Sequence, residues 1–83
     1  MDKALREQLI AYIDAKRDIS KKLSIEYDLL KIYREAAEHD YGVEYETTET
    51  AFHKGKIAAY EIIDVILTNK ITKIRGIKDE SEE

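Results

Sequence analysis

Two histidines, each preceded by a glutamate, are the residues of this sequence best suited to chemistry. Glu35 lies four residues before His39, and Glu49 lies four residues before His53. Residues four apart share one face of a helix, so each pair could offer two ligands to a metal ion. Carboxylate-bridged metal sites in helix bundles instead use a Glu-x-x-His motif on a buried face, and this motif is absent from the sequence. We therefore expect both histidines to be solvated on a charged helix end, and we predict no metal site.

Signatures of catalysis are missing as well. The chain has no G-x-S-x-G motif and no glycine-rich phosphate loop, and its three glycines are widely spaced. The absence of cysteine excludes disulfides and thiol nucleophiles, and it fits a reducing compartment such as the cytoplasm. The sequence thus predicts no catalytic residue, no cofactor and no enzymatic activity.

Basic residues form a first candidate binding surface. In an antiparallel helical hairpin, six of them are expected to gather in a patch away from the turn: Lys16, Arg17, Lys21, Lys22, Lys70 and Lys73. Such a patch could contact nucleic-acid phosphates. The interleaved Asp14, Asp18 and Asp64, together with the net charge of −4, favour ordinary solvated charge instead.

An acidic, tyrosine-containing turn is the second candidate surface. Residues 38–50 hold five acidic residues and no lysine or arginine. Tyrosine is enriched at binding hot spots, and surrounding acids steer toward a basic partner. The candidate partner-binding residues are Tyr41, Glu44, Tyr45 and Glu46. Alternatively, the two tyrosines fold back and seal the end of the bundle.

Apolar residues three and four apart trace one helical face from about residue 3 to residue 38. They are Leu5, Leu9, Tyr12, Ile13, Ile19, Leu23, Tyr27, Leu30, Tyr33 and Ala37. Lys16 interrupts this face, and a second row follows its later half: Ile25, Leu29, Ile32 and Ala36. We expect one continuous helix, because no glycine or proline lies within it. A break near Ser20 or Ser24, giving a three-helix monomer, is the alternative.

The second helix is predicted from about residue 48 to residue 74. Gly42 favours a turn before it, and Thr47 or Thr48 can cap its start. Gly76 is expected to stop it, and residues 78–83 are expected to form a disordered acidic tail. The sequence therefore predicts a single helical-hairpin domain over residues 1–77.

Apolar residues occupy more than one side of this second helix. One row, together with the neighbouring Ala51, contains Phe52, Gly55, Ala59, Ile62, Ile66 and Asn69. A second row contains Tyr60, Ile63, Leu67 and Ile71 or Ile74. A helix that is apolar over so wide an arc needs more than one neighbour. We assign the first row to helix packing and a dimer interface. Asn69 could fix the register of this interface, or it could lie in water near a frayed helix end.

Gly55 lies at the centre of the first row. A helical glycine costs about 1 kcal/mol relative to alanine, so close packing should offset that cost. A neighbouring helix is expected to approach Gly55 closely, or a bulky side chain such as Tyr27 or Tyr33 is expected to fill the notch.

The predicted fold is all-α, a long two-helix antiparallel hairpin that dimerises into a four-helix bundle. We expect a non-enzymatic protein–protein interaction module that acts as an adaptor or a stoichiometric inhibitor. A very short, acidic and all-helical chain without cysteine or proline is reminiscent of small phage or mobile-element proteins that block host machinery. The expected partners are a second copy and an unidentified protein, and the alternative function is a nucleic-acid-binding regulator. We expect no signal peptide, because charges interrupt the apolar residues of the N-terminus. No run of apolar residues is long enough to cross a membrane. We therefore expect a cytoplasmic location.

Overall fold

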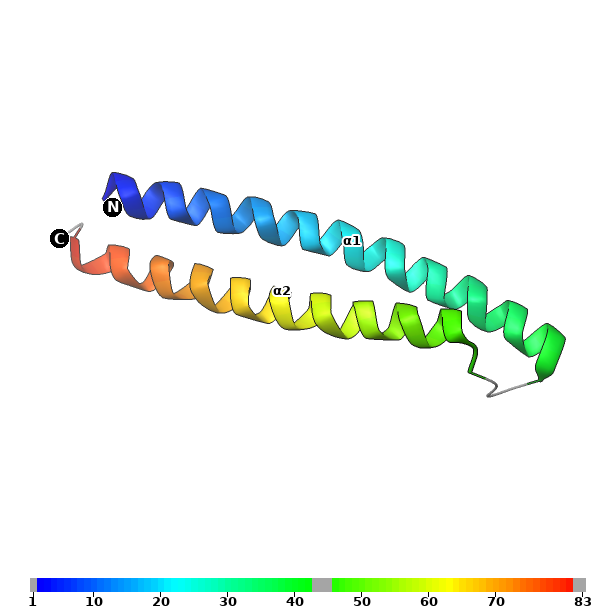
Figure 1. Cartoon of the computed structure of the whole chain (residues 1–83). Helices are drawn as coiled ribbons and strands as arrows, with labels where there is room; N and C mark the ends of the chain where they lie inside the picture. The colour runs from blue at the N-terminus through cyan, green and yellow to red at the C-terminus, as the bar shows by residue number, and fades with distance from the viewer. Residues whose placement is uncertain (1, 43–45, 82–83) are drawn as a thin grey trace.

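The computed structural model describes residues 2–42 and 46–81, and these residues form two helices and no strand. Helix α1 covers Lys3–Tyr41 and helix α2 covers Thr48–Ser81. They run antiparallel and side by side, with both chain ends at the same end of the molecule (Figure 1). The molecule is a rod with extents of 63 × 15 × 15 Å. The predicted all-α hairpin is confirmed.

Helix α1 is continuous through Ser20 and Ser24, so the alternative of a broken first helix is wrong. Its start is capped by Asp2, whose side chain accepts a hydrogen bond of 3.2 Å from the backbone N–H of Ala4. The helix ends at Tyr41 and is followed by Gly42, which has a φ of +98° that L-residues rarely adopt. The glycine thus accounts for the position of the turn.

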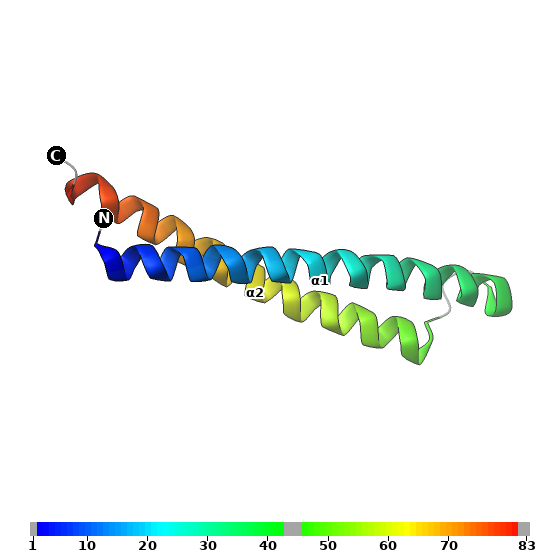
Figure 2. The ribbon, with the colours of Figure 1, turned by 90° about the horizontal axis from the view of Figure 1, so that it is seen from above.

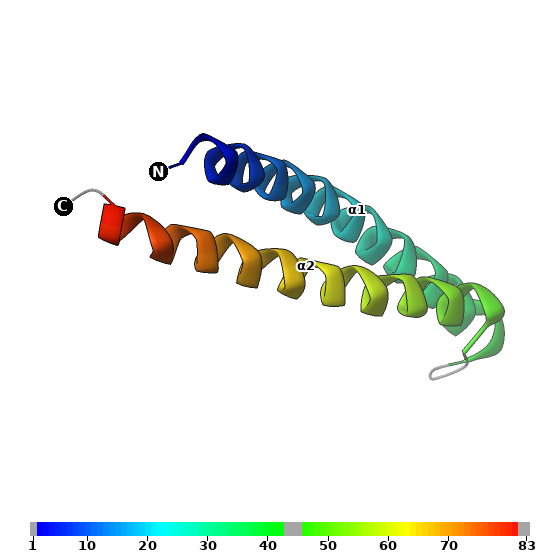
Figure 3. The ribbon, with the colours of Figure 1, turned by 60° about the vertical axis from the view of Figure 1, so that its left-hand side comes forward.

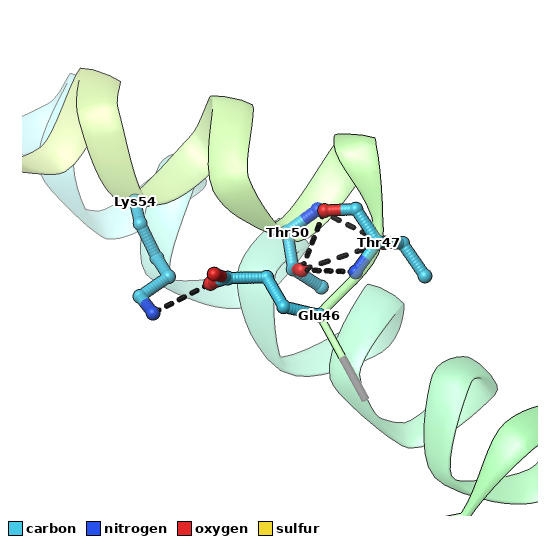
Figure 4. Close-up of polar contacts among 4 residues, drawn as sticks. All are labelled: Glu46, Thr47, Thr50 and Lys54. Carbon is cyan, nitrogen blue, oxygen red and sulfur yellow. Dashed lines mark hydrogen bonds and ion pairs between the residues drawn. The ribbon is translucent and has the colours of Figure 1, made fainter. Parts of the chain in front are cut away.

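Helix α2 begins with reciprocal threonine caps (Figure 4). The backbone N–H of Thr50 donates to the hydroxyl of Thr47 at 3.1 Å, and the N–H of Thr47 donates to the hydroxyl of Thr50 at 2.9 Å. Each side chain therefore satisfies a backbone donor that a helix start leaves unpaired, as in a capping box. The cap predicted at Thr47 or Thr48 is Thr47.

Helix α2 continues beyond the predicted end at Ile74, as far as Ser81. Among the described glycines, Gly42 is the one with positive φ, so Gly76 keeps helical geometry and does not act as a stop. Residues 78–81, predicted as disordered tail, are helical, while residues 82–83 lie outside the described part of the chain. Glycine permits a helix end but does not require one.

The two helices meet along stripes whose residues are three and four apart, as in an antiparallel coiled coil. The inner stripe of α1 is Leu5, Leu9, Tyr12, Lys16, Ile19, Leu23, Glu26, Leu30 and Ala37. The inner stripe of α2 is Thr50, His53, Ile57, Tyr60, Asp64, Leu67, Ile71 and Ile74. All of these residues are buried or half-buried. The helices cross in the view from above but stay beside each other when the rod is turned (Figures 2 and 3).

Candidate functional site

The row of α2 that we predicted to pack against a neighbour faces away from α1. Its residues, which we call the outer stripe, are Ala51, Phe52, Gly55, Ala59, Ile62, Ile66 and Asn69, and all are exposed. Phe52 is 60 % exposed and Ile62 is 62 % exposed. The inner stripe lies on the opposite side of the same helix, so α1 leaves the outer stripe uncovered. The role of the outer stripe as a dimer interface stays a prediction.

Gly55 does not receive α1 or a bulky side chain. A Cβ atom placed on it would meet no heavy atom within 4 Å outside the local helix backbone. Tyr27 instead donates a hydrogen bond to Glu61, which raises the pKa of Tyr27, and Tyr33 stacks on His53 with ring centroids 5.2 Å apart. Within the hairpin neither tyrosine fills the notch, because both contact other side chains.

Further apolar side chains extend the exposed surface beyond the outer stripe. An open hollow of about 430 Å³ lies between Ala58, Glu61, Ile62, Val65 and Ile66. On α1, Ile25 and Ile32 are more than half exposed. Helix α2 therefore presents aliphatic side chains over a wide arc that its partner helix in the hairpin cannot cover.

A buried polar cluster interrupts the core near the turn. Glu26 and His53, 5 % and 9 % exposed, occupy inner positions on opposite helices, and His53 Nδ1 lies 2.7 Å from Glu26 Oε1. Lys56 Nζ lies 3.1 Å from the other carboxylate oxygen. The hydrogen bond from His53 and the charge of Lys56 lower the pKa of Glu26, against the opposing effect of burial. A buried carboxylate thus has two cationic or donor partners.

His53 was therefore misassigned by sequence reasoning, which expected a solvated histidine beside Glu49. His39 does lie on an exposed helix end, where its ring is 3.1 Å from Asp40. The signal that could have placed His53 is its spacing, because it lies three residues after Thr50 and four before Ile57 on the inner stripe. Glu26 was not predicted as an inner residue, because the apolar face passes through its neighbour Tyr27 in the same turn of the helix.

A second polar layer lies further from the turn. Lys16 Nζ is 2.8 Å from Asp64 Oδ1, and both side chains occupy half-buried inner positions. The apparent interruption of the α1 face by Lys16 is therefore matched by an acid on α2. Together with the Glu26–His53 layer, this pair gives the two helices a specific register.

The six predicted basic-patch residues have different partners, and their role as one patch stays a prediction. Lys16 is paired with Asp64, Arg17 lies 3.9 Å from Asp14, and Lys70 lies over the ring of Tyr12. Lys70 and Lys73 line one hollow with Ile66 and Asn69, whereas Lys16 lines a different hollow with Arg75. Lys21 and Lys22 are exposed further along α1.

The acidic turn is described only in part. Tyr41 is the last residue of α1 and is 65 % exposed. Glu46 pairs with Lys54 at 2.6 Å at the start of α2 (Figure 4). Glu44 and Tyr45, the other two predicted partner-binding residues, lie outside the described residues.

Within residues 2–42 and 46–81, no group of three or more His, Asp or Glu side chains is arranged to hold a metal ion. Neither described helix has a stretch both long and apolar enough to cross a membrane. Comparison of the chain with protein-family models, curated proteins and solved structures finds no match. The geometry of the hairpin is thus the basis for a functional assignment.

Proposed function

We propose that this chain is a non-enzymatic helical interaction module that works as a homodimer. Two hairpins pack through their outer stripes into a four-helix bundle whose two α2 helices are central and whose two α1 helices lie outside. This bundle acts in the cytoplasm as an adaptor or a stoichiometric inhibitor of another protein. The observation that carries the proposal is the exposed outer stripe of α2, which has Phe52 near one end and Ile62 near its centre. Contiguous exposed apolar surface of this kind marks sites of association.

The accessible surface of the chain supports association. The hairpin exposes 6332 Å², whereas a compact monomer of 9.7 kDa exposes about 5,100 Å². The difference, roughly 1,200 Å², is more than the ~600–1,000 Å² that each partner buries in a standard stable interface. A second hairpin on the outer stripe would bring the exposed surface per chain close to that of an ordinary globular protein.

The nucleic-acid alternative has weaker support. Lys16 is already neutralised by Asp64, and Arg17 lies beside Asp14. Binding through the remaining lysines should show a steep loss of affinity with salt. We expect a fluorescence-anisotropy titration with duplex DNA and with RNA at about 50 mM salt to show no binding; tight, salt-sensitive binding would favour the regulator instead.

Sedimentation equilibrium of the full chain at micromolar concentration tests the dimer. We expect twice the monomer mass for the wild type and the monomer mass for Ile62→Asp, because a charge would be buried in the interface. Ile10→Asp is the matched control, since Ile10 is 54 % exposed on α1 and lies off the outer stripe; it should remain dimeric. A helical, monomeric wild type would contradict the proposal.

Once the dimer has been established, co-purification of a partner tests the adaptor or inhibitor role. Tagged wild-type chain should retain a host protein in a stoichiometric complex that survives purification. Tyr41→Ala tests the turn end of the module, and Ile10→Asp is again the control. If the dimer forms and no stoichiometric partner is found, a purely structural dimer replaces the adaptor.

A further inference from the structure

We propose that the occupant of the outer stripe is the α2 helix of a second copy, lying antiparallel and centred on Ile62. This inference rests on the proposed dimer and deepens it, because it assigns the interface and the orientation. Three observations on the described residues support it: the symmetry of the stripe, the sizes of its side chains and the distribution of charge along the rod.

The spacing of the outer stripe is symmetric about Ile62 to within one residue, because its positions lie 3, 7 and 10 residues before Ile62 and 4, 7 and 11 residues after it. The positions from Phe52 to Lys73 follow one another at intervals of three and four residues, and exposed Lys73 continues the stripe four residues after Asn69. A twofold axis at Ile62 therefore places these positions in matched layers. The layers are Ile62 with Ile62, Ala59 with Ile66, Gly55 with Asn69 and Phe52 with Lys73.

Side-chain sizes are complementary in this antiparallel arrangement. The small residues Gly55 and Ala59 each face a larger residue, Asn69 and Ile66 of the second copy. A parallel pair would place Gly55 on Gly55 and Ala59 on Ala59, so that small residues face each other and no side chain of the hairpin fills the space beside Gly55. Interiors that are packed to normal density disfavour such voids.

Charge along the rod favours the same orientation. Acidic residues lie toward the turn (Glu38, Asp40, Glu46 and Glu49), and the basic residues Lys70, Lys73 and Arg75 lie at the far end of the outer stripe, before the acidic residues of positions 79–83. An antiparallel pair puts the acidic end of one hairpin beside the basic end of the other. A parallel pair puts like charges together, which costs free energy at an interface.

The orientation has a functional consequence. Ile62 and Thr47 are 15 residues apart on α2, which corresponds to about 22 Å along a helix. The two turns of an antiparallel dimer therefore lie about 45 Å apart, at opposite ends. Each turn end presents Tyr41 and Glu46, so the dimer is a bivalent rod that can bridge two copies of a partner with a basic surface.

Cysteine cross-linking of the full chain tests the orientation, because the natural sequence has no cysteine. Gly55→Cys and Asn69→Cys are mixed, allowed to exchange and oxidised. We expect a mixed disulfide between the two variants and little self-linking of either. Ile62→Cys should self-link, because it meets its own copy at the axis. Asp28→Cys, exposed on α1, is the control and should stay unlinked.

The outcomes separate this inference from the proposed function. Self-linked Gly55→Cys and Asn69→Cys, with a dimeric mass in sedimentation, would overturn the antiparallel arrangement and leave the dimer standing. A dimeric mass with no link at any position of the outer stripe would place the interface elsewhere and overturn the inference. A monomeric mass under the same conditions would overturn both.

Discussion

Gly55 is a helical glycine with open space around it. Within the hairpin, a methyl group at this position meets no heavy atom within 4 Å outside the local helix backbone, so alanine brings its higher helix propensity without a steric penalty. The residue therefore lowers the stability of a single hairpin, and close approach of a second copy is the benefit that would offset this.

We predict that Gly55→Ala increases the free energy of unfolding by about 0.5–1 kcal/mol. Urea denaturation measures it, in an Ile62→Asp background so that the dimer does not contribute. Gly42→Ala is the control and should destabilise, because Gly42 has a φ of +98°. A loss of stability for Gly55→Ala would show that α1 approaches Gly55 after all.

Glu26 is the buried acid whose pKa is lowered, chiefly by the hydrogen bond from His53 and also by Lys56. Tyr33 stacks on His53, and Phe52 meets the same ring edge-on with centroids 5.3 Å apart. Because the folded chain holds the pKa of Glu26 below that of an unperturbed glutamate, about 4.3, ionised Glu26 stabilises the fold above that value. This stabilisation is lost as pH falls through the lower pKa of the folded chain.

We predict that Glu26→Gln is less stable than wild type at pH 6 and that the difference shrinks as the pH falls from about 5 to 3. Urea denaturation of both proteins across this range measures the difference. Glu35→Gln, an exposed acid on α1, is the control. A difference between wild type and Glu26→Gln that does not change with pH would show that ionisation of Glu26 is irrelevant to stability.

At the scale of the helices, two polar layers set the register of the hairpin. Lys16–Asp64 and Glu26–His53 each join an inner position of α1 to an inner position of α2. A slip of one helix by a turn would leave these side chains without partners in a partly buried seam, which costs more than the pairs contribute. The layers therefore confer specificity of pairing rather than large stability.

A double-mutant cycle on Lys16 and Asp64 tests this account. We expect Lys16→Leu and Asp64→Leu to cost about 1–2 kcal/mol each, because each leaves a half-buried partner unpaired. The double variant should recover most of this or exceed wild type. Urea denaturation gives the coupling. The exposed Arg17–Asp14 pair at 3.9 Å is the control, with an expected coupling energy of ~0.5 kcal/mol or less. Equal coupling energies for the two pairs would refute the role of the half-buried Lys16–Asp64 pair.

For the whole molecule, the ratio of exposed surface to buried core determines how closely folding depends on association. A rod 63 Å long and 15 Å wide has a single seam between its two helices, and helices of this kind gain most of their stability from packing rather than from propensity. A second hairpin would add a second seam along the outer stripe. Folding and association of such a chain are then one coupled equilibrium.

We predict that the midpoint of thermal unfolding rises with protein concentration, because dimerisation stabilises the folded chain by mass action. Circular dichroism at 222 nm over a roughly hundredfold concentration range measures it. Ile62→Asp should melt at a lower temperature that does not change with concentration, whereas Ile10→Asp should behave like the wild type. A wild-type midpoint that is constant over this range would show that each hairpin folds alone.

Much of the fold follows from the sequence alone. Runs of apolar residues three and four apart, free of proline, specify two long helices. Gly42 and Thr47 specify the turn and the start of α2, because one tolerates a positive φ and the other satisfies free backbone donors. The sequence also showed that α2 is apolar on more than one side. All of these features depend on interactions within one helix or one turn.

Only the tertiary structure decided which side of α2 faces α1. Periodicity places Phe52 and Ile62 in one row and Leu67 and Ile71 near another, and either row could have been the seam. The choice depends on pairs that cross between helices, such as Lys16 with Asp64 and Glu26 with His53. Spacing along one helix carries no information about these partners. A lysine that looked like an interruption and a histidine that looked solvated therefore proved to lie on the inner stripes.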